Sequence, residues 1–150
     1  MKHATGMLLY VFLCLLTSAC TSSTVLETQN ALRDPGAARL HFIRPSTFVG
    51  AFQSIGITIN GTKIGSLGVG THLYIDREPG QYNVVIAHEL DFGKWEQTIE
   101  APSRQEYYFK IVPGPISVTS VGTTTVVNGR MGVIPISEGE GTSLIEAIKN

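Results

Sequence analysis

The chain has few cysteines and few charged residues, and each shortage excludes certain classes of protein. Its 150 residues include only two cysteines, and charged residues make up 15% of the sequence. A scaffold held together by several disulfides is therefore excluded. The 11 basic and 12 acidic residues nearly balance, and the basic ones are scattered singly. This pattern gives neither the basic footprint of a nucleic-acid-binding domain nor a polybasic patch for anionic lipid.

Motifs for catalysis and metal binding are scarce as well. The sequence has no HExxH zinc motif and no G-x-S-x-G nucleophile elbow. The glycine-rich run Gly65–Gly70 lacks the Lys-Ser/Thr ending of a phosphate-binding loop, so turns and a bulge explain it better. His88, Glu89 and Asp91 form the most suggestive cluster, for which a solvated turn is the better interpretation. We therefore expect no catalytic residues, no metal site and no cofactor.

Long apolar runs are absent except for one near the N-terminus. After Lys2 and His3, the ten residues Met7–Leu16 carry no charge, and small residues follow up to Cys20. A membrane-spanning helix needs about 20 apolar residues, whereas a shorter run is typical of the core of a signal peptide. We therefore predict a secretory signal peptide over residues 1–19 in preference to a transmembrane helix.

The end of this segment resembles the lipobox of bacterial lipoproteins, in which the mature chain begins at a lipid-modified cysteine. Ser18 and Ala19 precede Cys20, although Thr17 stands where the lipobox usually has Leu. An ordinary cleaved signal with an incidental cysteine is the alternative. Lipidation of Cys20 by several acyl chains, palmitate among them, would remove the free thiol that remains in an oxidising compartment once Cys14 leaves with the signal.

The residues after Cys20 bear on where the protein would lie and how far it would reach. In lipoprotein sorting an Asp after the cysteine favours retention in the inner membrane, so Thr21 implies the outer membrane, facing the periplasm. Residues 20–37 are polar without a clear period, and we predict a lipidated cysteine followed by a flexible tether that reaches roughly 20–25 Å. A short helix over Val25–Leu32 is the alternative. The folded domain would comprise residues 38–150, a length that suits one domain.

Short segments from Ala38 onward alternate apolar and polar residues, with turn signals between them. Asn60-Gly61 is a strong hairpin signal, because both residues tolerate the positive φ of a type I′ turn. Residues 138–141 are expected to be a loop, and Thr142–Asn150 fits a short terminal helix. This spacing predicts an all-β fold, a single antiparallel β-sandwich of immunoglobulin-like or transthyretin-like type with about seven to nine strands. The predicted strands are Ala38–Arg44, 54–59, Thr62–Leu67, 71–76, 81–88, 94–100, 106–112, 117–127 and 130–136.

The C-terminal part of this pattern predicts a second hairpin. Pro113-Gly-Pro115 is expected to break the strand before it. Ser117–Val127 is rich in Thr and Val and uncharged, and Asn128-Gly129 offers a turn into Arg130–Ile136. An uncharged edge of high β-propensity promotes aggregation, so we expect this hairpin to be paired or covered.

Aromatic residues supply the candidates for contact with a partner. Neighbouring residues of a strand point to opposite faces, so Tyr107 and Phe109 are expected to pack inside while Tyr108 lies outside. Phe48 and Phe52, in the connection after the first strand, either cap the core or form a contact patch, and the core is favoured. Phe48, Phe52 and Tyr108 are thus the possible partner contacts.

Several of these segments together resemble a bacterial family of uncharacterised lipoproteins, defined only as a domain of unknown function. The resemblance covers roughly Ala38–Val112 and implies a β-sandwich and an envelope lipoprotein. It carries over no catalytic residues, because none are defined for the family. The matching motifs are Ala38-Arg-Leu-His-Phe-Ile-Arg-Pro-Ser46, Ile57-Thr-Ile-Asn-Gly-Thr-Lys-Ile-Gly-Ser-Leu67, Tyr74-Ile-Asp76 and Pro79-Gly-Gln-Tyr-Asn-Val84.

The sequence thus favours a lipid-anchored cell-envelope β-sandwich that acts as a non-catalytic binding or structural module. Its partners would be the membrane, through the anchor, and an envelope protein or polymer, and not nucleic acid. One alternative is an envelope hydrolase or metal-dependent enzyme that uses His88, Glu89 and Asp91. Another is an accessory lipoprotein of a secretion or pilus assembly.

Overall fold

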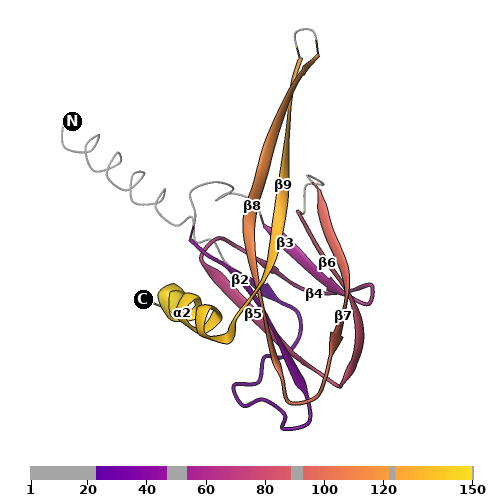
Figure 1. Cartoon of the computed structure of the whole chain (residues 1–150), viewed down its shortest axis with the longest axis vertical. Coiled ribbons are helices and arrows are strands. Elements are labelled where there is room, and N and C mark those ends of the chain that lie inside the picture. Colours follow the sequence, from indigo (N-terminus) through magenta and orange to yellow (C-terminus); the bar gives the residue numbers. More distant parts are fainter. Residues whose placement is uncertain (1–22, 47–53, 89–92, 122–123, 150) are drawn as a thin grey trace, which may run out of the picture.

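The computed structural model of the chain describes residues 23–46, 54–88, 93–121 and 124–149. These residues form strands in two sheets and one helix at the C-terminal end (Figure 1). The elements are β1 (Thr24–Val25), β2 (Ala38–Arg44), β3 (Ile55–Ile59), β4 (Thr62–Leu67), β5 (Thr71–Arg77), β6 (Gly80–His88), β7 (Lys94–Ala101), β8 (Glu106–Val121), β9 (Thr124–Ile136) and α2 (Glu138–Lys149).

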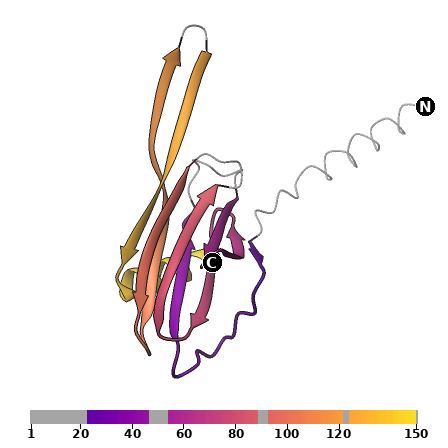
Figure 2. The same ribbon diagram turned by 90° about the vertical axis from the view of Figure 1, so that its right-hand side faces the viewer.

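The two sheets face each other as the layers of a sandwich, which confirms the predicted fold class (Figure 2). Sheet A has the strand order β1-β4-β3-β6-β7, and sheet B has the order β5-β2-β8-β9. One pairing differs from the wholly antiparallel prediction, because β2 and β8 run parallel, from Arg39 opposite Glu106 to Ile43 opposite Lys110. Between these strands the chain forms β3 and β4 in sheet A, β5 in sheet B, and β6 and β7 in sheet A. It returns at the end where β2 begins, with the amide of Arg39 donating to the carbonyl of Gln105 at 2.9 Å.

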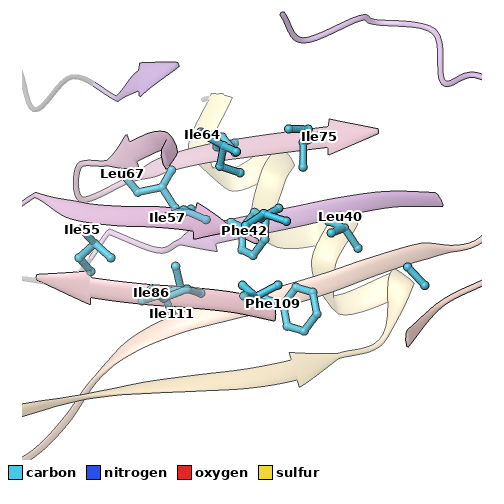
Figure 3. Close-up of a cluster of buried hydrophobic side chains, with 14 of the residues drawn as sticks. Leu40, Phe42, Ile55, Ile57, Ile64, Leu67, Ile75, Ile86, Phe109 and Ile111 are labelled. Atoms are coloured by element: carbon cyan, nitrogen blue, oxygen red, sulfur yellow. The ribbon is translucent and has the colours of Figure 1, made fainter. Parts of the chain in front are cut away.

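The core lies between the sheets and follows the period-two pattern of the sequence. Leu40 and Phe42 on β2 meet Ile57 and Ile86 from the opposite sheet, and all four side chains are fully buried (Figure 3). Each fully buried aliphatic or aromatic side chain contributes about 1.5–3 kcal/mol relative to an exposed one. The burial of these alternate residues therefore fixes which face of each strand points outward.

The Asn60-Gly61 hairpin has the predicted conformation. Asn60 has φ 48° and Gly61 has φ 79°, and the two residues join β3 to β4. Positive φ at both central residues is the requirement of a type I′ turn. This local signal therefore sets the register of the two pairs next to the turn, and an extra residue in β4, Ile64, shifts the register beyond them.

The predicted ends of β8 and β9 are wrong. β8 continues through Pro113 and Pro115, and the register shift between Pro113 and Ile116 absorbs the irregularity. Asn128 and Gly129 do not form a turn but pair with Ser117 and Ile116 inside the β8–β9 ladder. The high β-propensity of the Thr/Val-rich residues on both sides sustains the ladder past the prolines.

The distal parts of β8 and β9 project beyond the sandwich as a two-stranded ribbon (Figures 1 and 2). We call residues 116–121 and 124–129 the arm. Their register runs from Ile116 opposite Gly129 to Val121 opposite Thr124. In the described part of the chain, each strand of the arm pairs only with the other, so the outer edge of each strand is open.

The helix begins at Glu138, so the predicted loop over residues 138–141 is wrong. Ser137 caps the helix: its hydroxyl accepts from the amide of Glu140 at 3.3 Å, and its carbonyl accepts from the amide of Gly141 at 2.9 Å. Ser followed by Glu at the third helical position is the capping-box pattern. This local cap outweighs the low helix propensity of Gly139 and Gly141.

Candidate functional site

Polar and aromatic side chains gather on the face of sheet B that points away from the core. Because Leu40 and Leu73 point inward, their neighbours on the same strands point outward. Strand pairing then places Asp76 and Glu106 on either side of Arg39. The outer-face cluster, as we call it, comprises Arg39, His41, His72, Tyr74, Asp76, Glu106 and Tyr108.

His41 is the centre of this cluster. Its ring stacks on that of Tyr108, with the centroids 4.4 Å apart, and meets that of His72 edge to edge, with the planes nearly parallel and the centroids 5.1 Å apart. His41 Nε2 lies 3.2 Å from Glu106 Oε2, and His41 Nδ1 lies 2.9 Å from His72 Nε2. Because a carboxylate only accepts, His41 carries its proton on Nε2, and its Nδ1 accepts from His72. The hydroxyl of Tyr108 donates to the same Glu106 oxygen at 2.6 Å.

The protonation states of the cluster follow from burial and from these bonds. Burial lowers the pKa of His41 although Glu106 opposes the shift, and burial together with the charges of His41 and Lys149 lowers the pKa of His72 to about 4. Burial would raise the pKa of Glu106, but bonds from Tyr108 and His41 outweigh it and lower that pKa. Burial and the Glu106 bond raise the pKa of Tyr108 to about 12. At neutral pH the imidazoles of His41 and His72 are therefore neutral, and Glu106 beside them is a carboxylate.

Arg39 joins the cluster to the N-terminal segment. Its guanidinium binds Asp76 with two bonds, of 2.6 and 2.8 Å, and lies 4.6 Å from the ring centroid of Tyr74. The same guanidinium donates to the carbonyls of Asn30 at 2.8 Å and Ala31 at 3.3 Å. A bidentate arginine–carboxylate pair with further hydrogen bonds fixes the orientation of both side chains in addition to neutralising their charges.

Helix α2 covers the part of the cluster that Tyr108 forms. Gly141 lies against Tyr108 so closely that a methyl group at residue 141 would overlap the tyrosine ring. Lys110 Nζ pairs with Glu140 Oε1 at 2.9 Å and ties the first turn of the helix to β8. As a result Tyr108 is only 6% exposed. The alternation correctly predicted that Tyr108 points away from the core, although α2 lies over it and leaves little of it exposed. Its role as a partner contact stays a prediction.

The N-terminal segment, residues 24–37, lies along the domain where a free tether was predicted. β1 pairs with β4, and the amide of Leu26 donates to the carbonyl of Ile64 at 3.0 Å. Gly65 permits this approach, because a Cβ there would come within 2.5 Å of the carbonyl oxygen of Thr24. The segment therefore covers the edge of sheet A.

The same segment then crosses to the edge of sheet B. Gln29 Nε2 donates to the carbonyl of Tyr74 in β5 at 2.8 Å. Arg77 binds both carboxylate oxygens of Glu27, at 3.0 and 2.9 Å. Together with the bonds from Arg39, these contacts close one side of the sandwich across both sheets.

Most of the remaining predicted site residues lie outside the described residues, namely Cys20, Phe48, Phe52, Glu89 and Asp91. His88 lies at the end of β6, and its Nδ1 is the one buried side-chain N or O atom of the described chain without a hydrogen-bond partner. Burial and then the charge of Arg44 lower the pKa of His88. Over the described ranges, no group of three His, Cys, Asp or Glu side chains is placed to hold a metal ion.

Sequence reasoning missed the outer-face cluster, although a signal for it was present. The polar members occupy alternate positions of three predicted strands, such as Arg39 and His41 on β2 or Tyr74 and Asp76 on β5. A predicted terminal helix needs a sheet face to cover, and these positions offered one. What was missing was the adjacency of β2 and β8, which joins residues far apart in the sequence.

The polar groups of the cluster bond one another, Tyr108 packs against α2, and Arg39 bonds the N-terminal segment, so the arrangement holds both elements on sheet B. Within the described part of the chain, no helix is both long and apolar enough to cross a membrane. A sequence model of the family described as "Protein of unknown function (DUF2846)" matches residues 34–123. Neither the curated proteins nor the solved structures contain a significant match.

Proposed function

The chain belongs to the DUF2846 family of proteins of unknown function, and from this premise we propose that it is a lipid-anchored protein of the bacterial cell envelope. In this proposal its β-sandwich is a non-catalytic binding or structural module, held at the outer membrane by acyl chains on Cys20. Its partner is an envelope protein or polymer. The family assigns no activity, so the proposal depends on the chain itself.

The observation that carries the proposal is the docking of the N-terminal segment on the domain. Thr24 is already paired with Ser66, and it lies only four positions after Cys20 (24 − 20). Four extended residues span at most about 14 Å. Acyl chains on Cys20 would therefore hold the sandwich at the membrane surface, and the contacts of Glu27 and Gln29 would hold it there as a rigid unit.

The chemistry of the outer-face cluster supports a structural role in preference to catalysis. A general base needs a free lone pair near a substrate. His41 instead uses both ring nitrogens, one toward Glu106 and one toward His72. Tyr108 and His41 are also buried, with 6% and 7% of their surface exposed.

The proposal is tested by replacing each of the two cysteines in the intact gene and fractionating the cells. We expect Cys20→Ser to move the protein out of the membrane fraction, while the matched change Cys14→Ser leaves it there. Mass spectrometry of the native protein should show a mature chain that begins at an acylated Cys20. Membrane association unchanged by Cys20→Ser, or an unmodified N-terminus, would contradict the anchor.

A further inference from the structure

The N-terminal segment enters the sandwich at the same end from which the arm leaves it. Thr24 pairs with Ser66, next to Leu67 at the end of β4. The carbonyl of Leu67 accepts from Arg44 Nη1 at 2.9 Å, so the ends of β4 and β2 lie together. β8 runs parallel to β2 and continues past Lys110 in that same direction. The residues just before β1 and the arm therefore share one end of the molecule.

The arm and its base form the longest uncharged stretch in the domain. The 19 residues from Ile111 to Gly129 include no Asp, Glu, Lys, Arg or His, and the first charged residues on either side are Lys110 and Arg130. Water-exposed strand edges usually carry charges that keep other strands away. An isolated two-stranded ribbon is also marginally stable in water. The lack of charged residues and the marginal stability of an isolated ribbon both indicate that the arm lies against a partner whose contact surface does not require charged side chains.

The arm is longer than the link between Cys20 and the sandwich. β8 rises by about 3.3 Å per residue, so the nine residues that follow Val112 up to Val121 span about 30 Å. The link from Cys20 to Thr24 spans at most about 14 Å. An acylated Cys20 therefore brings the membrane surface within the length of the arm.

We propose that the arm is a membrane-contacting element that lies in the headgroup region of the bilayer in which the acyl chains of Cys20 are embedded. This inference rests on the proposed lipid anchor. The open edges of the arm place it in the interface and not in the hydrocarbon core, because unpaired backbone groups find hydrogen-bond partners among headgroups and water but none among acyl chains. The arm thereby adds a second attachment point, which orients the sandwich on the membrane.

The test measures the depth of one spin label on the arm and one at the opposite end of the sandwich. The mature protein has no free thiol once Cys20 is acylated, so Thr119→Cys gives a single label in the arm. Ser103→Cys is the matched control, because Ser103 is exposed in the turn between β7 and β8, at the opposite end. Each labelled, acylated protein is reconstituted into vesicles of phosphatidylethanolamine and phosphatidylglycerol. The collision rates of the label with oxygen and with a water-soluble nickel chelate are then compared.

We expect the ratio of oxygen to nickel collisions at residue 119 to rise several-fold on reconstitution, while the ratio at residue 103 stays at its value in solution. A label at residue 119 that stays equally accessible to nickel, on protein whose mass shows an acylated Cys20, overturns the arm proposal alone. Spin–spin coupling between labels at residue 119, with shielding that disappears on dilution in lipid, assigns the arm to a second copy of the chain and also overturns it. An unmodified Cys20 overturns the anchor and the arm proposal together.

Discussion

The ring of Tyr108 lies flat against the imidazole of His41, with the centroids 4.4 Å apart and the planes inclined by 4°. The two residues are directly opposite each other in the parallel pair β2–β8. Both bond the same oxygen of Glu106. The stack therefore forms a flat surface on sheet B, and the first turn of α2 lies on it at Gly141.

The fit of α2 on Tyr108 makes two glycines of one helix respond in opposite ways to alanine. Gly139→Ala meets no atom within 4 Å and should raise the free energy of unfolding by about 0.5–1 kcal/mol through helix propensity. Gly141→Ala overlaps the Tyr108 ring and should lower it by about 1–3 kcal/mol. Urea unfolding of the wild-type protein and of the two variants measures both changes. Equal effects of the two changes would contradict the close contact.

The buried imidazoles should make the domain less stable in acid. His72 has a folded pKa of about 4, below its unfolded value of about 6.5. Between these values the unfolded chain binds a proton that the folded chain does not, so stability falls as the pH falls from 6.5 to 4. The loss from this residue is at most about 3 kcal/mol.

His72→Gln should remove most of that pH dependence, and the urea midpoint measured from pH 7 to pH 4 checks it. His88→Gln is the matched comparison, since His88 lies at the end of β6, away from the cluster. The pKa of His88 is lowered too, but only that of His72 falls as far as about 4, so the slope should decrease less in His88→Gln. A slope that persists in His72→Gln and disappears in His88→Gln would assign the acid sensitivity to the wrong histidine.

The close approach of the N-terminal segment to β4 should depend on Gly65. Gly65→Ala would bring a methyl group against the carbonyl of Thr24 and the side chain of Leu73, so β1 should detach at a cost of about 1–3 kcal/mol. Gly56→Ala, whose nearest atoms are 3.7 Å away, is the control in the neighbouring strand. Hydrogen exchange should accelerate at the amide of Leu26 in the first variant only. Protection that survives Gly65→Ala would show that β1 tolerates the methyl group.

The Arg39–Asp76 pair should contribute far more to the free energy of unfolding than an exposed pair of one basic and one acidic side chain. Asp76→Asn leaves the buried guanidinium without its carboxylate and should cost about 3 kcal/mol. Glu96→Gln breaks the exposed pair with Lys94 and should leave the urea midpoint nearly unchanged. The two midpoints, measured side by side, give the comparison. A small effect of Asp76→Asn would mean that the bonds to Asn30 and Ala31 suffice to hold Arg39.

Local sequence signals predicted much of the fold, whereas features set by contacts between residues far apart in the sequence were not predicted. Alternation predicted the inward face of β2, and Asn60-Gly61 predicted a hairpin, because each depends on neighbouring residues alone. The same local reasoning assigned a turn to Asn128-Gly129, where the ladder to Ser117 and Ile116 outweighs the turn propensity of the pair. The capping box at Ser137 was a readable local signal that two helical glycines obscured.

The candidate site was harder to predict, because it joins three strands and a helix. Alternation could show that Tyr108 faces away from the core, but not that α2 covers that face. The parallel register that brings Tyr108 to His41 has no signature in either strand, since it results from the packing of both sheets. A polar outward face beside an amphipathic terminal segment is the pattern that would have indicated such a covered cluster.

The parallel pairing of β2 with β8 also sets an order of assembly. It joins Arg39 to Glu106, 67 positions later (106 − 39), and a contact of such long sequence separation forms late and slows folding. A chain made from its N-terminus onward cannot complete sheet B until β8 and β9 have followed, and the helix that covers Tyr108 comes last. The topology therefore leaves the outward face of β2 bare until nearly the whole polypeptide has been made.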